Sequence, residues 1–321
     1  MLGLKSFTPL TRKHFTVLVY PSDLLPPLIK STGNHMSQPN LDFFLPPPKA
    51  TYSWSDQDIE QRLFFSGGRF TKVNGVLAGL LGLFLAGVTY GSAFIFPKSR
   101  FAEICLERGP TPCAIIILFW CSMAILFIKW RKLCLQRKLL DIDIIPAEKD
   151  FVLSSETVDE VTGYMIKIVD NPKYFVLYNR INVALSNLRN LGRVGDIDDI
   201  LRAQADQDRS AMETSYGTLQ AFVWAIPVLG FIGTVLGLSE AIGTFGSVLE
   251  ASDDLTQISS SLQGVTGGLA TAFETTLIAL IAALIIQLTM TTLKKSEEEF
   301  LDNAMDYCIR NVVGRLRLIN R

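Results

Sequence analysis

The distribution of apolar residues along the chain predicts an α-helical membrane protein. A helix needs roughly 20 apolar residues to cross a bilayer, and four segments meet that length. The predicted spans are residues 71–97, 112–130, 218–247 and 264–293. We therefore expect an all-α fold, a polytopic membrane helix bundle with about four transmembrane helices.

The charges between the predicted spans indicate their orientation. The segment "KWRKLCLQRK" at the end of the second span is strongly basic, and two lysines follow the fourth span. Such loops are enriched on the cytoplasmic side. The loop 248–263 contains acids but no lysine or arginine, so it is predicted to be periplasmic. The loop 98–111 has basic residues, but the count of four spans places it outside as well.

The remaining segments are predicted to be cytoplasmic, and so are both termini. Residues 131–217 are charged and have helical periodicity, which predicts helices that extend the third and fourth spans beyond the membrane. Within them, the apolar positions Phe175, Ile181 and Leu188 follow a helical spacing. Residues 294–321 are predicted to form a C-terminal helix. Residues 1–70 are predicted to form an arm that is partly disordered, since their beginning is rich in proline.

Composition narrows the functional classes. The chain is 49% hydrophobic, with a mean hydropathy of +0.30 and a net charge of −1. These values argue against an ordinary soluble domain and against nucleic-acid binding. The two histidines lie in the N-terminal arm and the five cysteines show no CxxC spacing, so we expect no catalytic residues, no metal site and no cofactor. Cys105 and Cys113 flank a predicted outer loop, where they either pair or remain free thiols.

The third span is unusually rich in small residues for a membrane helix. Gly230, Gly233 and Gly237 fall near one stripe of the helix, which permits a close helix–helix contact. Pro227 removes one backbone donor and is expected to kink the same helix. These four residues are predicted to set helix packing.

Hydroxyl and carboxyl groups in the last two spans suggest an ion pathway. Thr234 in the third span is predicted to lie at a similar depth to Thr276 in the fourth, and Thr271 lies nearby. Hydroxyls both donate and accept hydrogen bonds, so facing threonines can line a polar path. Glu274 is a further candidate, because a carboxylate within a span is functional by default. It could equally be a hydrated residue near the outer interface, and hydration is preferred for Glu240.

Two motifs in these spans together resemble the MotA/TolQ/ExbB proton-channel family. They are "IPVLGFIGTVLGL" and "GGLATAFETTLIALIAAL", and the resemblance extends over about residues 205–295. The chain departs from many relatives at Ala279 and Ile285, where glycine and proline are expected. Pro227 matches a family position linked to helix bending.

The resemblance implies a bacterial inner-membrane motor subunit rather than an enzyme. It implies a homo-pentamer around two copies of a single-span partner of the ExbD, TolR or MotB kind, whose membrane aspartate takes up and releases protons. Thr234 and Thr276 would line the ring that faces this aspartate. The transported ion would be H+ or, alternatively, Na+, and its flow would drive mechanical work. The alternative is a membrane scaffold that holds a partner without conducting ions.

Overall fold

The computed structural model describes residues 52–63, 65, 67–68, 70–98, 110–142, 144–145, 152–154, 157–191, 194–251 and 255–316. The chain divides into two units, Met1–Pro47 and Pro48–Arg321. The first unit, and with it most of the predicted N-terminal arm, lies outside the described residues. Cys105 lies outside them too, so its pairing with Cys113 stays a prediction.

The described part of the second unit is helical, as predicted. Its helices are α1 (Trp54–Gln57), α2 (Ile59–Arg62), α3 (Gly75–Ile95), α5 (Pro110–Leu140), α6 (Val158–Ile168), α7 (Val176–Leu191), α8 (Val194–Ser215), α9 (Gly217–Ala251) and α10 (Leu255–Tyr307). Short 3-10 turns and one π-helical turn, Cys308–Val312, complete it. Among these residues no β-strand forms, although two isolated bridges join Tyr52 to Val169 and Leu153 to Leu316.

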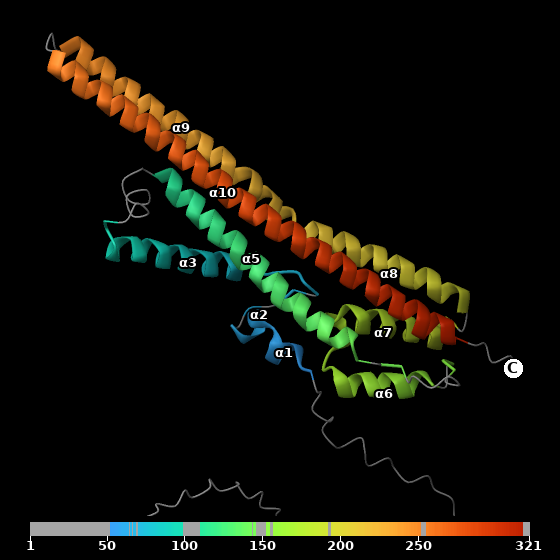
Figure 1. Cartoon of the computed structure of the whole chain (residues 1–321). Helices are drawn as coiled ribbons and strands as arrows, with labels where there is room; N and C mark the ends of the chain where they lie inside the picture. The colour runs from blue at the N-terminus through green and yellow to red at the C-terminus, as the bar shows by residue number, and fades with distance from the viewer. Residues whose placement is uncertain are drawn as a thin grey trace, which may run out of the picture. The chain divides into compact units, whose positions relative to one another are not determined.

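Four helices of the described residues are long and apolar enough to cross a membrane, so the chain is a multi-pass membrane protein. They are α3, α5, α9 and α10. α9 and α10 form a hairpin and lie side by side, α5 packs against both, and α3 packs on α5 (Figure 1). α8 leads into α9 and runs along the second half of α10 (Figure 1).

The hairpin helices are longer than the apolar segments that mark the spans. Helical structure reaches Ala251 in α9 and resumes at Leu255 in α10, so it covers much of the loop predicted over 248–263. At the other end α10 continues to Tyr307 without interruption. The helix predicted to start at residue 294 is therefore a continuation of the fourth span, because Lys, Glu, Leu and Ala all favour helix.

The core lies where α5, α7, α8 and α10 meet. Most apolar residues described in α7, and the residue before it, are buried; among them are Phe175, Ile181 and Leu188, as their spacing predicts. Phe300 near the end of α10 and Cys308 in the turn that follows it are buried in the same cluster. This base supports the hairpin, which carries the residues of interest.

Candidate functional site

A seam of small residues joins α9 to α10. A Cβ atom on Gly230 would lie only 2.6 Å from Cβ of Ala279, and one on Gly237 would lie 3.3 Å from Cβ of Ala272. Farther along, a Cβ on Gly268 would lie 2.8 Å from Cβ of Ala241. The first contact leaves no room for a larger side chain. Two of these contacts involve glycines that the sequence singled out, Gly230 and Gly237, and the third involves Gly268, which it did not.

Ala279 fits this seam. It is fully buried, and its methyl group fills the space that the missing side chain of Gly230 leaves. The small residue in one helix is therefore matched by a small residue in the other. This explains why the departure from the family pattern at position 279 is compatible with a tight hairpin.

Two predicted pathway residues come together at the seam. The Thr276 hydroxyl donates a hydrogen bond of 2.9 Å to the backbone carbonyl of Gly230 across the hairpin. In a regular α-helix the same carbonyl accepts the amide of Thr234, four residues later. Thr234 itself is half-buried, and its hydroxyl donates to the carbonyl of Phe231 at 2.6 Å. The two threonines therefore lie within about one helical turn of each other.

Gly233 marks a junction of three helices that sequence reasoning missed. A Cβ atom on this residue would lie 3.0 Å from the hydroxyl oxygen of Thr111, at the start of α5, and 3.0 Å from that of Thr275 on α10. Thr275 is 3% exposed and donates to the carbonyl of Ala272. The first threonine of the "TT" pair therefore packs against the glycine stripe. The "TPC" sequence at the start of α5 gave no signal for this contact.

The other predicted residues lie apart from the two threonines. Glu274 is half-buried, but it precedes Thr276 by two residues, which rotates it about 200° around α10. It therefore projects away from the seam. The side chain of Thr271 lies outside the described residues. Glu240 is exposed, and Pro227 is half-buried within α9, which continues as a helix on both sides of it.

The threonine hydroxyls at the seam can accept hydrogen bonds, but they do not take up a proton themselves. The hydroxyls of Thr234 and Thr276 already donate to backbone carbonyls. Each oxygen still has lone pairs for a water molecule or for a protonated group on another chain. Within the described residues no group of histidine, cysteine and acidic side chains has the arrangement to hold a metal ion.

Buried ion pairs at the base are a second feature that the sequence did not reveal. Lys129 lies 3.4 Å from Glu297 and donates to the Ser215 hydroxyl at 2.8 Å. Arg180 lies 2.8 Å from Asp208 and also donates to the backbone carbonyl of Leu301. All four charged side chains are at most 4% exposed. The basic residues of "KWRK" mark the predicted cytoplasmic boundary, but their spacing does not identify their partners.

Lys132 anchors the segment that precedes the first span. Its ammonium group lies 2.6 Å from the carboxylate of Glu60 and 3.7 Å from that of Asp58. It also donates a hydrogen bond of 2.8 Å to the backbone carbonyl of Lys72. Glu60 also accepts the amides of Gly68 and Asn74. Burial raises the pKa of the Asp58 carboxyl, although Lys132 and the amide of Glu60 oppose this effect. Two carboxyls thus share one lysine.

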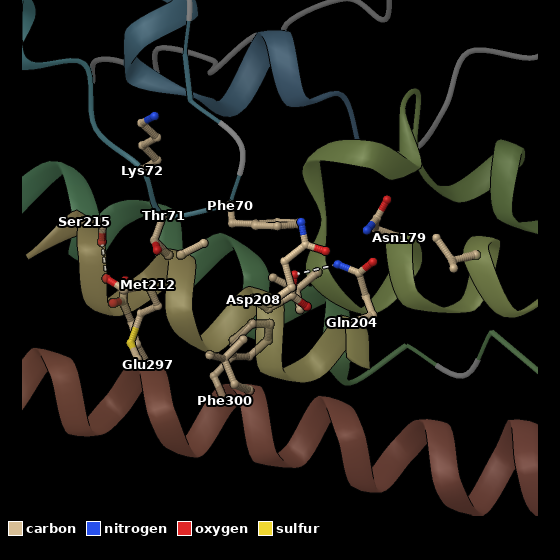
Figure 2. A pocket seen from close by; sticks show the side chains of 15 residues that line it. Phe70, Thr71, Lys72, Asn179, Gln204, Asp208, Met212, Ser215, Glu297 and Phe300 are labelled. Atoms are coloured by element: carbon tan, nitrogen blue, oxygen red, sulfur yellow. Dashed lines mark hydrogen bonds between the residues drawn. The ribbon is translucent and has the colours of Figure 1, made fainter. Parts of the chain in front are cut away.

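A cavity of about 380 Å³ lies between α7, α8, α10 and the segment before the first span. Figure 2 shows Phe70 and Thr71 on one side and Glu297 and Phe300 on the other. Asp208 lines it as well, with its carboxylate accepting from Gln204 at 3.0 Å. Asp208 and Glu297 already form ion pairs, which leaves the exposed Lys72 as the remaining charged residue of this lining.

Comparison with known protein families gives a match over the hairpin and part of its base. Residues 176–305 match the model of the MotA/TolQ/ExbB proton channel family. This confirms, over α7 to most of α10, the resemblance that the two motifs predicted. That family consists of channel and stator proteins, not enzymes. No curated protein and no solved structure matches the chain.

Proposed function

Because residues 176–305 match the MotA/TolQ/ExbB proton channel family, we propose that the chain is the channel-forming subunit of an energy-transducing stator. The transported ion is a proton, with Na+ as the alternative. The subunit assembles as a pentamer in the bacterial inner membrane around two copies of an ExbD/TolR/MotB-like single-span partner. The observation that carries this proposal is the family match over a hairpin in which Thr276 bonds to the Gly230 carbonyl, one helical turn from Thr234.

In this proposal the chain forms the wall of the ion channel, and the partner supplies the acid that titrates. Thr234 and Thr276 offer hydroxyl oxygens to the partner's membrane aspartate and to water, while Gly230, Gly233 and Gly237 fix the spacing of the two helices. Uptake or release of a proton by the aspartate changes which of several equivalent subunits it faces, and thereby biases a rotation. Thr271 is proposed to border this pathway, whereas Glu274, on the opposite side of α10 from Thr276, is proposed to lie outside it.

The test replaces both pathway hydroxyls. The Thr234→Val, Thr276→Val double variant, purified with its single-span partner and reconstituted in vesicles, is expected to lose most of the proton flux that a pH-sensitive dye reports. Thr291→Val is the matched control, because Thr291 is exposed on the same helix and its hydroxyl donates to its own helix. Flux at the wild-type level in the double variant would refute the assignment.

One contact supports a non-conducting scaffold as the second candidate. The Thr276 hydroxyl donates to the Gly230 carbonyl, which is also what a purely structural threonine does in a membrane hairpin. A scaffold requires the glycines but not the hydroxyl oxygens. It would assemble with its partner but pass no protons in vesicles, whether or not the threonines are replaced.

A further inference from the structure

A groove runs between α5 and α10 and is distinct from the seam of the hairpin. It has a volume of about 560 Å³ and is lined by apolar side chains along most of its length. Leu126, Leu133 and Leu293 form its floor and are buried, whereas Leu288 is largely exposed at its edge. This groove has no place in the proposed ion pathway.

The threonine hydroxyls along the groove already donate hydrogen bonds within the protein. Thr289 and Thr292 line it, but their hydroxyls donate to the carbonyls of Ile285 and Leu288 on α10, at 2.8 and 2.9 Å. The wall therefore presents hydrocarbon and satisfied donors. An apolar chain would fill such a groove at no cost in lost hydrogen bonds.

The groove has about the length of one leaflet of a bilayer. It extends along α5 from Met123 to Arg137, which is about 21 Å at 1.5 Å per residue. Half of a bilayer with its headgroups measures about 20–22 Å. Phe127 and Trp130 lie between these ends, both about half exposed, with their rings 6.1 Å apart. Exposed tryptophan is typical of the membrane–water interface.

The cytoplasmic end of the groove carries a positive charge that differs from its neighbours. Lys129 and Lys132 are buried, each beside a buried carboxylate. Arg137 is 46% exposed; it donates to the carbonyl of Ser296 at 2.8 Å, and its nearest acid, Glu299, is exposed and 3.8 Å away. A guanidinium group has five N–H donors, so most of them remain for a phosphate.

We propose that this groove binds one anionic phospholipid of the inner leaflet per subunit. Its acyl chains lie against Met123 and Leu126, the glycerol region lies level with Trp130 and Leu133, and the phosphate contacts Arg137. An amphipathic lipid is favoured over a helix of a second copy because the groove joins a hydrocarbon wall to one exposed cation, Arg137, at its end. We choose an anionic lipid because its headgroup would be attracted by the positive charge of Arg137.

Native mass spectrometry of the full-length protein tests the proposal. The protein is stripped of lipid in detergent and titrated with phosphatidylglycerol or phosphatidylcholine of identical acyl chains. We expect one phosphatidylglycerol per subunit, and Arg137→Gln should weaken its binding about fivefold while leaving phosphatidylcholine unchanged. The matched control is Arg131→Gln, because Arg131 is exposed in the same basic segment but does not line the groove. Equal phosphatidylglycerol binding by wild type and Arg137→Gln would overturn the proposal.

A second variant and a second measurement test the acyl-chain part. Leu288→Trp, at the exposed edge, should fill the groove and abolish binding of both lipids; retained binding in a folded Leu288→Trp protein contradicts the proposal. In vesicles, phosphatidylglycerol should slow maleimide labelling of Cys134, which lines the groove, and Arg137→Gln should reduce this protection. Unchanged labelling, or cross-linking of Cys134 to a second copy, would show that no lipid occupies the groove.

Discussion

The hairpin seam and the base of the molecule bury very different groups. Along α9 and α10, glycine and alanine bring two backbones into contact, and the Thr276 hydroxyl of one helix donates a hydrogen bond to the Gly230 carbonyl of the other. At the base, Lys129, Lys132 and Arg180 are buried with carboxylates.

The difference reflects the solvent that each region excludes. Lipid tails are as apolar as leucine, so membrane helices associate through close packing and not through the hydrophobic effect. At the base, water drives apolar burial, and charged groups buried with it must be paired. Three substitutions test this contrast.

Lys132→Met should have the largest effect, because it leaves Glu60 and Asp58 buried without their cation. Removing one partner of a buried ion pair costs about 3–5 kcal/mol, so we expect a large fall in the melting temperature of the detergent-solubilised protein, followed by tryptophan fluorescence. Arg131→Gln, an exposed neighbour, should melt like the wild type. Adding Glu60→Gln to Lys132→Met should recover part of the loss, and equal melting of wild type and Lys132→Met would contradict the prediction.

Gly230→Leu should have an intermediate effect, because even its Cβ would lie 2.6 Å from Ala279. Overpacking of this kind costs about 1–3 kcal/mol and should force α9 and α10 apart. The control is Gly243→Leu on the same helix, since a Cβ there meets nothing within 4 Å. Melting temperature measures both variants. If the paired exchange Gly230→Ala, Ala279→Gly is no more stable than Gly230→Ala alone, the described register is wrong.

Asp58→Asn should have the smallest effect and should raise stability. Burial raises the pKa of Asp58 in the folded state, so the folded protein holds this proton more tightly than the unfolded chain does. Stability from this group is present below the unfolded pKa and is lost as pH rises through the folded pKa. Asparagine can still accept the amide of Glu60 at the start of α2. Melting temperature measured from pH 3 to 7 should therefore fall less in the variant; an identical pH profile would argue against the shift.

The seam was more predictable from the sequence than the base. Gly230, Gly237, Thr234 and Thr276 form local patterns on two neighbouring helices, and the short connection between the helices fixes their antiparallel pairing. Helical periodicity also suffices to calculate that Glu274 lies on the opposite face of α10 from Thr276. The motif over these residues carried the family resemblance as well.

The base depends on pairs that are distant in the chain. Glu297 lies 168 residues from Lys129, and Glu60 lies 72 residues from Lys132. A periodic pattern shows that a helix has a buried face, but it does not show which charge on another helix meets it. Lysines near a span also have an obvious alternative explanation in membrane orientation, which concealed their burial.

The length of α10 has a mechanical consequence. One uninterrupted helix of 53 residues carries Thr276 at the seam and Glu297 at the base. The two residues are separated by about 32 Å along the helix axis. If the helix pivots as a stiff rod at the seam, each degree of tilt displaces Glu297 by about 0.5 Å. A local rearrangement at the two threonines would thus displace the far end of α10 sideways, without a hinge within the helix.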